Sequence, residues 1–405
     1  MRLTAAAKIA LVAGVGVAAS FLGDRALGAL GFAADWAPPA DHGPNHDEVR
    51  HNVEFNYAFR TNSQGIRYRE LPLAKTSPAE YRTLVLGDSY AEGFGVDESK
   101  TFANRLEQTL SNSSRQAEFI NCGLTGTGPL QYGRVFLDVG LRYHPDGVLI
   151  VLHANDVSDT DSRSYEMVNR GIWFIPPDAE RSPARRAAHA LWPHAYLMGR
   201  GMLAQYQRRH PGNAVASLEN LAKTKGVSQE RIAVWQKSLP PDLAKLIGTD
   251  EFSWWILGLG LVNQAYWTDS LDIDTESARA RWNAMDGVLT ELVNQARGRN
   301  LPVAVVFAPI AFQYDPEYGD LWRQVGVHVR REWLSEETEL ERRLQQWAGD
   351  RGVPLLNLTP RFRQAVRDGR RGLNFRLDPH WTEAGHALAA DAIATWLSSV
   401  NPSLH

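Results

Sequence analysis

The 405-residue chain has little of what would assign it to a protein class at once. It has a single cysteine, Cys122, so neither an internal disulfide framework nor a zinc cluster of thiolates can form within one chain. Its 43 basic and 46 acidic residues give a net charge of −3, so no overall positive field attracts nucleic acid or an anionic membrane. A nucleic-acid partner is therefore not expected, and function has to be sought in local motifs.

Long apolar runs are also scarce, and the run at the start of the chain is short. Arg2 and Lys8 flank the start of this run, which covers residues 9–22. A membrane-spanning helix needs about 20 apolar residues, so the run fits a signal peptide, with small residues near Ala33 as a cleavage site. An uncleaved membrane anchor over 1–33 is the second interpretation. Both predict an exported protein, periplasmic or extracellular, and the second adds a tether to the inner membrane.

The rest of the chain divides by composition. Residues 34–49 are rich in Pro, Asp, His and Gly without apolar periodicity, which predicts a linker. Residues 50–405 then have the pattern of one large domain. Within it, the stretch 161–275 is far longer than a crossover between parallel strands needs, which predicts a helical, cap-like insertion. Its many tryptophans either fill a small core of their own or lie exposed.

Short apolar segments alternate with amphipathic helices through most of this domain. Helices are predicted from apolar residues at helical spacing, one beginning at Ser335 and the last capped by Thr382. Five strands are predicted, over 83–86, 118–121, 148–152, 303–307 and 353–358. This alternation indicates an α/β fold with a parallel central sheet covered by helices on both faces.

A serine directly follows the first of these strands. The tripeptide Gly87-Asp88-Ser89 places Ser89 at the carboxyl edge of the sheet, where open α/β sheets bind ligands. Serine also commonly caps a helix, so the tripeptide alone is weak support for a nucleophile. Ala91 stands where the nucleophile elbow G-x-S-x-G has its second glycine, which argues against the α/β-hydrolase fold.

Two further turns follow strands at the same edge. The glycine-rich turn 121–129 can bring backbone N–H groups close to a ligand, but its glycines are in the wrong order for a dinucleotide fingerprint. After the third strand, Asn155 offers an amide donor, although Asn also favours turns. The acidic run Asp156, Asp159 and Asp161 lacks the glycine and terminal glutamate of a calcium-binding loop, and we interpret it as a solvated turn.

The last motif, Asp378-Pro379-His380, precedes the final helix. In an extended segment residues i and i+2 point the same way, so Asp378 can accept a hydrogen bond from the His380 ring while the other ring nitrogen faces Ser89. A serine hydroxyl needs such a base near neutral pH. A metal site of Asp378, His380 and His386 is disfavoured, because no further ligand has a metal-binding spacing, and no metal or other cofactor is expected.

These four motifs resemble the four blocks that define the SGNH, or GDSL, hydrolase superfamily. The match spans residues 82–397, less the insertion, and implies a flavodoxin-like three-layer α/β/α sandwich. The resemblance assigns Ser89 as the nucleophile, His380 with Asp378 as the rest of the catalytic set, and Ser89, Gly126 and Asn155 as the oxyanion hole.

Two positions depart from the common pattern of that superfamily. Only Pro379 separates the Asp from the His, where many members have two residues, and Ala154 stands in place of a usual glycine. The D-x-H-W form resembles SGNH proteins of bacterial envelopes, including those that move acetyl groups on exopolysaccharides. The stretch 62–67 also resembles the lead-in of bacterial members and is expected to lie against the sheet.

Three functions follow from these motifs. The first is an esterase that removes acetyl or another small acyl group through an acyl-serine, with an acylated small molecule or carbohydrate as substrate. The second is an O-acyltransferase that passes the same acyl group to an envelope or extracellular polysaccharide, which exposed Trp254, Trp255 or Trp267 would favour by stacking on sugars. The third is an inactive carbohydrate-binding envelope protein.

Overall fold

The computed structural model describes most of the chain in two compact units. It describes residues 5–30, 43–160, 164–168, 171–175, 183–196, 226–247 and 254–400, and the single positions 198, 199, 202 and 222. One unit comprises residues 1–43 and 164–211, and the other comprises 44–163 and 212–405. The central sheet and every residue of the predicted catalytic set belong to the second unit.

The second unit is built on a parallel sheet of five strands. In chain order these are β3 (Glu80–Leu86), β4 (Gln116–Asn121), β5 (Gly147–His153), β8 (Val303–Ala308) and β9 (Leu355–Asn357). They lie in the spatial order β4-β3-β5-β8-β9 and pair in parallel. Counted along the sheet sequence, this is the order 2-1-3-4-5 of flavodoxin-like folds. The predicted α/β fold with a parallel central sheet is therefore confirmed.

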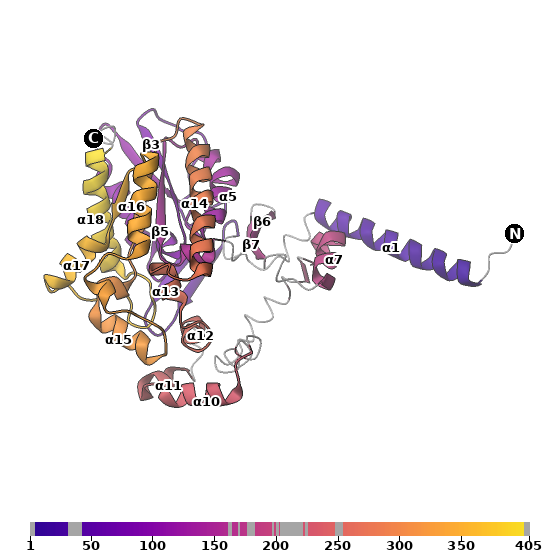
Figure 1. Ribbon diagram of the computed structural model, residues 1–405. Coiled ribbons are helices and arrows are strands. Elements are labelled where there is room, and N and C mark those ends of the chain that lie inside the picture. Colours follow the sequence, from indigo (N-terminus) through magenta and orange to yellow (C-terminus); the bar gives the residue numbers. More distant parts are fainter. Residues whose placement is uncertain are drawn as a thin grey trace. The chain divides into compact units, whose positions relative to one another are not determined.

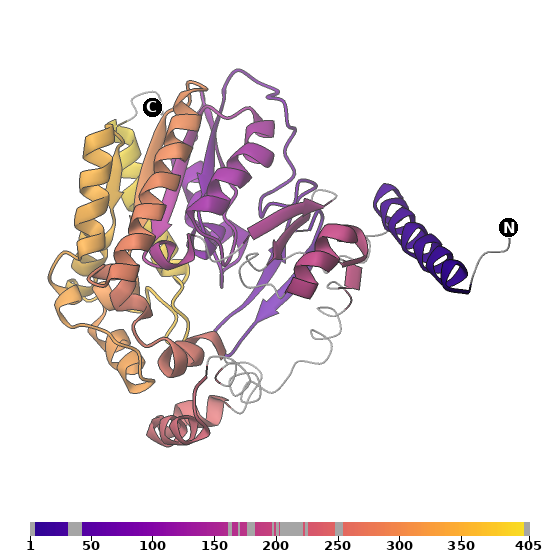
Figure 2. The same cartoon turned by 45° about the vertical axis from the view of Figure 1, so that its right-hand side comes forward.

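Helices cover both faces of this sheet (Figure 1). The chain moves from β3 to β4 in one direction and from β4 to β5 in the other, so right-handed crossovers place the two connecting helices on opposite faces. On one face α4 (Phe102–Leu110) packs against α18 (Glu383–Val400), and on the other α5 (Pro129–Asp138) packs against α14 (Glu276–Arg297). Figure 2 shows the same layering after a turn of the molecule.

The strand sequences explain why they are central. All seven residues of β5, Gly147–His153, are buried, and so are the last five of β3. Continuous apolar runs of this kind suit strands that are covered on both faces, because no side of the strand meets water. Cys122, which follows β4, is buried in the same core, and its N–H donates to the carbonyl of Val85.

The second unit contains further helices. They are α3 (Ser89–Glu92), α6 (Asp156–Asp159), α10 (Gln229–Ser238), α11 (Pro241–Ile247), α12 (Trp254–Val262), α13 (Tyr266–Leu271), α15 (Pro316–Gln324), α16 (Glu339–Arg351) and α17 (Thr359–Arg367). The sequence predicted that α16 begins at Ser335. It begins after Thr338 instead, because Thr338 and Glu341 form a reciprocal capping box.

A hairpin that the sequence pattern did not reveal precedes the sheet. Strands β1 (Asp47–His51) and β2 (Asn56–Arg60) pair antiparallel, so the predicted linker 34–49 overlaps β1 by three residues. The turn between them is set by Asn52, whose side-chain oxygen accepts the N–H groups of Glu54 (2.7 Å) and Phe55 (3.0 Å). β1 is mostly polar, and the apolar alternation of β2 covers only five residues, which is why this hairpin was missed.

The long stretch between β5 and β8 contains both helices and a hairpin. Strands β6 (Ser164–Val168) and β7 (Gly171–Ile175) pair antiparallel, and α7 (Pro183–Leu191) follows them in the first unit. Helices α10 to α13 belong to the second unit. The side chains of Trp254 and Trp255 and much of the arginine-rich stretch 181–209 lie outside the described residues.

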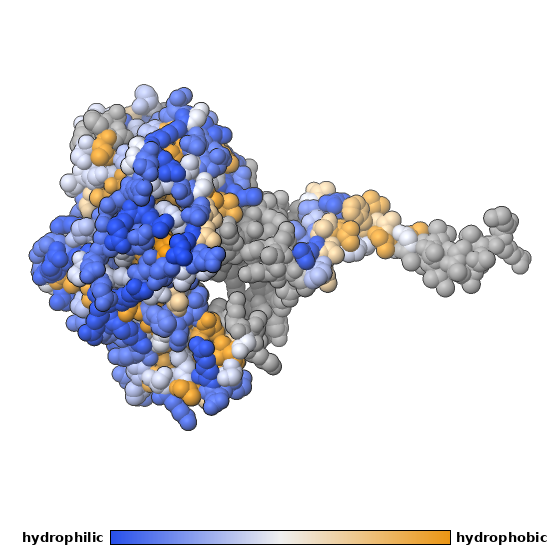
Figure 3. Space-filling model, in the orientation of Figure 1, coloured by the Kyte–Doolittle hydropathy of each residue, from blue (hydrophilic) through white to orange (hydrophobic). Residues whose placement is uncertain are grey.

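In the first unit, the N-terminal helix α1 (Ala5–Ala29) contacts the segment after α7. The Asp24 carboxylate accepts the N–H of Ala195 (2.7 Å), and the Trp192 indole N–H donates to Ser20 (3.1 Å). In Figure 3 the described part of α1 is largely apolar, whereas hydrophilic residues cover most of the second unit on the face shown. Among the described residues, none of the helices combines the length and apolar character needed to cross a membrane.

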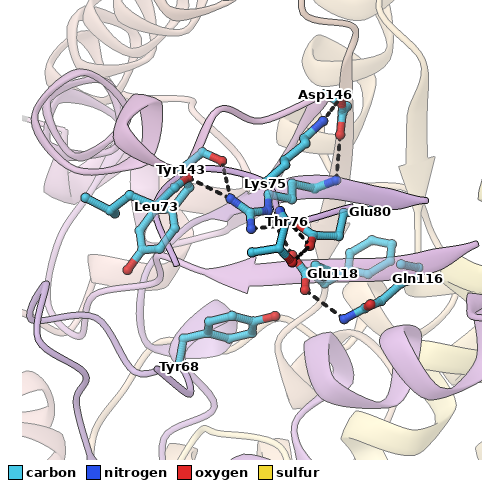
Figure 4. Close-up of polar contacts among 12 residues, drawn as sticks. Tyr68, Leu73, Lys75, Thr76, Glu80, Gln116, Glu118, Tyr143 and Asp146 are labelled. Atoms are coloured by element: carbon cyan, nitrogen blue, oxygen red, sulfur yellow. Dashed lines mark hydrogen bonds and ion pairs between the residues drawn. The ribbon is translucent and has the colours of Figure 1, made fainter. Parts of the chain in front are cut away.

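A buried cluster of charges lies at the amino ends of β3 and β4 (Figure 4). Arg82, fully buried, donates to the carboxylates of Glu118 (2.9 Å) and Glu80 (2.7 Å). Its guanidinium also donates to the carbonyls of Leu73 (2.8 Å) and Tyr143 (2.9 Å). Because cation and carboxylates are paired and hydrogen-bonded to one another, the cost of burying their charges is offset within the cluster.

Candidate active site

The serine predicted as nucleophile lies in a tight turn at the end of β3. Asp88 caps α3, its carboxylate accepting the N–H of Tyr90 (2.9 Å), and Ser89 is the first residue of that helix. A side chain at Gly87 would come within 2.6 Å of the Ala91 side chain and 2.8 Å of a carbonyl oxygen of β5, so only glycine fits there. The turn therefore fixes the Ser89 hydroxyl at the carboxyl edge of the sheet.

Ser89, His380 and Asp378 are brought together in a hydrogen-bonded line. The Ser89 Oγ lies 2.7 Å from His380 Nε2, and His380 Nδ1 lies 2.5 Å from Asp378 Oδ1. The same carboxylate oxygen accepts the backbone N–H of His380 (3.0 Å), which fits the single residue between the two. This is the geometry in which an imidazole can take the proton of a serine hydroxyl while a carboxylate orients the ring.

The electrostatic surroundings of His380 favour its protonated form. Burial alone would lower the pKa of His380, but the charge and hydrogen bond of Asp378 outweigh it and raise the pKa above its ordinary value. Asp88 and Glu92 add to this increase. A raised pKa suits a base that must hold a proton after the serine attacks and then release it to a leaving group.

Aromatic rings enclose the His380 imidazole on more than one side. The Phe94 ring centroid lies 4.6 Å from that of His380 and the Tyr90 centroid 5.3 Å away. The Tyr90 hydroxyl donates to the carbonyl of Pro379 (2.5 Å), as does the Asn374 amide (2.6 Å). The loop that carries the histidine is thus attached to the helix that carries the serine.

The glycine-rich turn is held by the same short helix. Glu92, one turn after Ser89, accepts the N–H of Thr125 (3.1 Å) and its hydroxyl (2.6 Å). Gly126 follows with a φ of +74°, in the left-handed region that favours glycine. Gly123 packs so closely on α3 that a Cβ there would meet the backbone nitrogen of Glu92 at 2.3 Å. The predicted oxyanion-hole residue Gly126 therefore lies on a loop anchored to the serine helix.

Asn155, the other predicted oxyanion donor, directs its amide at two carboxylates. Its Nδ2 donates to Asp88 (3.0 Å) and to Asp159 (3.2 Å), and Tyr266 of α13 donates to the same oxygen of Asp159 (3.1 Å). A substrate oxygen would have to replace Asp159 to receive a hydrogen from this amide. The structure thus places Asn155 beside the Asp88 turn but with its donors engaged.

The acidic run after β5 differs from the predicted solvated turn. Asp156 is fully buried, accepting the Tyr132 hydroxyl (2.6 Å) and the backbone N–H of His153 (2.8 Å). Burial raises the pKa of Asp156 well above its ordinary value, and the charge of Asp88 adds to the increase. The prediction was wrong for Asp156 because its carboxylate finds hydrogen-bond partners inside the fold, which a local sequence pattern does not reveal. Asp161 lies outside the described residues.

His386, considered as a metal ligand, and Trp267, considered for stacking on sugars, are both buried. His386 is 1% exposed, and burial lowers its pKa to about 3, so its neutral ring accepts the N–H of Phe102 (3.3 Å). Trp267 is also 1% exposed and packs against the rings of His153 and Phe312. Trp267 therefore fills the core, which is the first of the two alternatives left open by the sequence, and this residue does not offer a surface for stacking on sugars.

The lead-in stretch 62–67 contributes more to the site than a contact with the sheet. The buried Arg67 guanidinium donates to the carbonyls of Glu92 (3.0 Å), Gly93 (2.6 Å) and Val96 (2.5 Å). Glu92 is the last residue of the helix that begins with Ser89, and Gly93 is its C-cap, so the guanidinium satisfies the carbonyls at the end of this helix. Sequence reasoning did not find this role of Arg67 or that of Glu92, because neither has a local spacing that signals a contact across the fold.

No family model matches the chain, and no curated protein does. Similar solved structures include a member of the lipolytic protein G-D-S-L family from Veillonella parvula, at 9% identity and a TM-score of 0.36, covering 78% of this chain and 98% of that one.

Two other solved structures are similar at the same level. They are an acetyl xylan esterase, at 10% identity and a TM-score of 0.37, covering 78% of this chain and 99% of that one, and a lipase/acylhydrolase from Enterococcus faecalis, at 11% and 0.36, covering 79% and 96%. At identities and TM-scores this low, the geometry of the site has to carry any functional conclusion.

Proposed function

We propose that the chain is a serine-dependent ester hydrolase that acts on small acyl esters, with acetyl as the preferred group, through an acyl-serine intermediate. One observation carries the proposal: Ser89 Oγ, His380 and Asp378 form a continuous hydrogen-bonded line with distances of 2.7 and 2.5 Å. The fold brings Ser89 and His380 into this line from positions 291 residues apart in the chain.

The geometry gives each residue a step in the reaction. Ser89 Oγ attacks the ester carbonyl while its proton passes to His380 Nε2, and Asp378 stabilises the imidazolium that forms. The backbone N–H groups of Ser89 and Gly126, and the Asn155 amide once it leaves Asp159, are proposed to donate to the carbonyl oxygen as it becomes negative. The imidazolium then protonates the departing alcohol, which leaves an acyl group on Ser89. Water, deprotonated by His380, releases the acid and restores the serine.

Transfer of the acyl group to a sugar hydroxyl is the second candidate. It uses the same acyl-serine and differs only in what attacks it. The observation in its favour is the enclosed surroundings of the pair: the side chains of His380 and Asp378 are 14% and 8% exposed, which restricts the access of bulk water. The burial of Trp267 removes one of the three rings that would have supported stacking on a sugar.

The test is reaction with a fluorophosphonate, followed by turnover of p-nitrophenyl acetate. We expect one phosphonyl group on Ser89 by peptide mass spectrometry, a measurable turnover in the wild type, and loss of both in Ser89→Ala. Oligosaccharide acceptors that raise the rate of ester consumption and appear acylated would favour transfer over hydrolysis. Absence of both labelling and turnover in folded protein would reject the proposal and favour an inactive carbohydrate-binding protein.

We also propose that the protein is exported and that its substrate is an acylated carbohydrate or small molecule outside the cytoplasm. The support is the basic start and short apolar run of the N-terminus. Cell fractionation with mass measurement of the mature N-terminus tests this. Recovery of the intact chain in the cytoplasmic fraction would overturn it.

A further inference from the structure

The carboxylate of Glu54 joins the loop that carries Asp378 to the hairpin of β1 and β2. We propose that Glu54, in the turn between β1 and β2, is a positioning residue that holds this loop so that Asp378 can orient His380. The proposal deepens the proposed function and rests on it for the role of His380 as the base.

Three consecutive backbone N–H groups of the loop converge on Glu54. Arg376 donates to Oε1 at 2.6 Å, and Leu377 and Asp378 donate to Oε2 at 2.8 Å and 3.0 Å. Successive N–H groups that point inward form a concave site for an anion, and hydrogen bonds to a charged acceptor are stronger than neutral ones. The carboxylate therefore fixes the backbone of the loop up to the residue that contacts His380.

The turn that presents Glu54 is itself well fixed. The Asn52 side chain accepts the N–H groups of Glu54 and Phe55, and Asn52 N–H donates to the Phe55 carbonyl at 2.9 Å. The Phe55 ring packs against Phe94 at 5.4 Å and against Phe375 at 5.1 Å between centroids. Phe94 also contacts His380, so the hairpin turn is linked through Phe94 to His380 and through Phe375 to the loop that carries Asp378.

The far end of the loop is held by different groups. The Pro379 carbonyl accepts hydrogen bonds from Tyr90 and Asn374. Glu54 thus binds the backbone N–H groups of residues 376–378. Tyr90 and Asn374 bind the carbonyl of the next residue, Pro379. Loss of Glu54 would leave three backbone donors without this acceptor and would release the half of the loop that carries Asp378.

The charge of Glu54 carries an electrostatic cost. Burial raises the pKa of Glu54 and the nearby Asp378 charge adds to the increase, whereas the N–H groups of Leu377 and Arg376 oppose it. A half-buried carboxylate beside another carboxylate would be unfavourable without the hydrogen bonds it accepts. Such a cost is expected if Glu54 serves to position the loop and not to stabilise the fold locally.

The experiment measures the pKa of His380 directly, by NMR titration of protein labelled at histidine Cε1, with the signal assigned through His380→Gln. The variants are Glu54→Gln, Glu54→Asp, Asp378→Asn and, as a matched control, Glu70→Gln, whose carboxylate accepts a backbone N–H from Ser63 at 2.9 Å away from the site. Glu54→Asp keeps the charge but shortens the side chain, so it also serves if Glu54→Gln does not fold.

We expect the pKa of His380 in Glu54→Gln to fall at least about halfway to its value in Asp378→Asn, with an intermediate value in Glu54→Asp and none of this change in Glu70→Gln. The rate of phosphonate labelling of Ser89 should fall by about 10- to 100-fold in Glu54→Gln, because small displacements of catalytic groups have effects of that size. A folded Glu54 variant with the wild-type His380 pKa would overturn the proposal, however much its melting temperature falls.

The titration does not depend on turnover, so the two proposals fail separately. A wild type that neither reacts with phosphonate nor turns over ester, but whose His380 pKa responds to Glu54, would reject the proposed function and retain the positioning role. A fully active wild type whose His380 pKa ignores Glu54 would do the reverse.

Discussion

The two ends of the central sheet each gather buried charged and polar groups, but they do so differently. At the amino ends of the strands, Arg82 is paired with Glu80 and Glu118 and also donates to two carbonyls. At the carboxyl ends, Ser89 and His380 lie among carboxylates that crowd one another. One strand, β3, contains Arg82 and leads directly into the turn that carries Ser89.

The difference lies in the direction in which the pKa values shift. At the amino ends burial alone would raise the pKa of Glu80, but hydrogen bonds from Thr76 and the charge of Arg82 outweigh it and lower the pKa. At the carboxyl ends the pKa of His380, of Asp88 and of Asp156 is raised, the last two chiefly by burial. Within the part of the chain that the structure describes, His153 Nε2 and Asn155 Oδ1 are buried there without a hydrogen-bond partner. Compensated charges stabilise a fold, whereas perturbed and partly unsatisfied ones are typical of a reactive site.

The largest effect is expected from a substitution at the carboxyl ends of the strands. His380→Ala should reduce turnover of an ester substrate by about 10⁴-fold, because the serine loses its base. Its free energy of unfolding should change far less than in a variant of the amino-end cluster. Steady-state kinetics and urea denaturation measure the two quantities, and His328→Ala, an exposed histidine, is the control with wild-type turnover. Turnover within tenfold of the wild type in His380→Ala would remove the contrast.

The second effect breaks the amino end. Arg82→Ala should lower the free energy of unfolding by about 3–5 kcal/mol, because Glu80 loses its buried cation and Glu118 keeps its ion pair with Arg69 but loses the one with Arg82. Any folded protein should keep the wild-type pH dependence of ester turnover. Arg331→Ala is the control: its side chain is 76% exposed, and its loss should cost less than about 0.5 kcal/mol in the same urea titration. A similarly small cost for Arg82→Ala would show that the cluster does not stabilise the sheet.

The third effect uses two histidines that must stay neutral. Burial lowers the pKa of both His153 and His386 to about 3, against 6.5 when unperturbed. Because the folded pKa is depressed, their stabilisation is fully present above about pH 6.5 and is lost as pH falls toward 3. Linkage predicts a loss on the order of 2 kcal/mol per residue between pH 7 and 5. Urea titrations should show this slope reduced in His386→Gln, and an unchanged slope would contradict it.

The smallest effect sharpens the comparison at the site itself. The pKa of His380 is raised, so the base is still partly protonated at pH 6.5 and gains activity as pH rises through its pKa. We expect the rate of ester turnover at pH 6.5 to be less than about half its plateau value. A pH–rate profile tests this, and single-turnover measurements on Asp378→Asn should place the acid limb at lower pH. An acid limb below pH 6.5 in the wild type would refute the assignment.

The sheet could be predicted from the sequence because its signals are local. Runs such as 148–152 are apolar along their whole length, and the turns that follow them carry Ser89 and Asn155, so the strands and the edge where these residues lie could be predicted together. The motif Asp378-Pro379-His380 is local too, and its geometry follows from an extended chain. These elements account for the fold class and for the three residues that the structure brings into one line.

The supports of the site could not be predicted, because they depend on contacts between distant segments. Glu54 and Leu377 are separated by 323 positions, and Arg67 acts on the carbonyl of Glu92, 25 positions away. In the sequence, Glu54 and Arg67 look like ordinary surface charges, because nothing near them in the chain indicates these distant partners. Asp156 shows the opposite error, since an acidic residue in a turn-rich stretch proved to be buried.

The burial of Cys122 means that alkylation of its thiol can report local opening of the fold. The thiol is 1% exposed, and burial raises its pKa to about 12, so it resists alkylating reagents while the fold is closed. It lies directly after β4, within the glycine-rich turn 121–129 that also carries Gly126. Because the chain has no second thiol, the rate at which Cys122 is alkylated under native conditions measures how often that turn opens. Slower alkylation after a phosphonate has reacted with Ser89 would show that an occupied site keeps the turn closed.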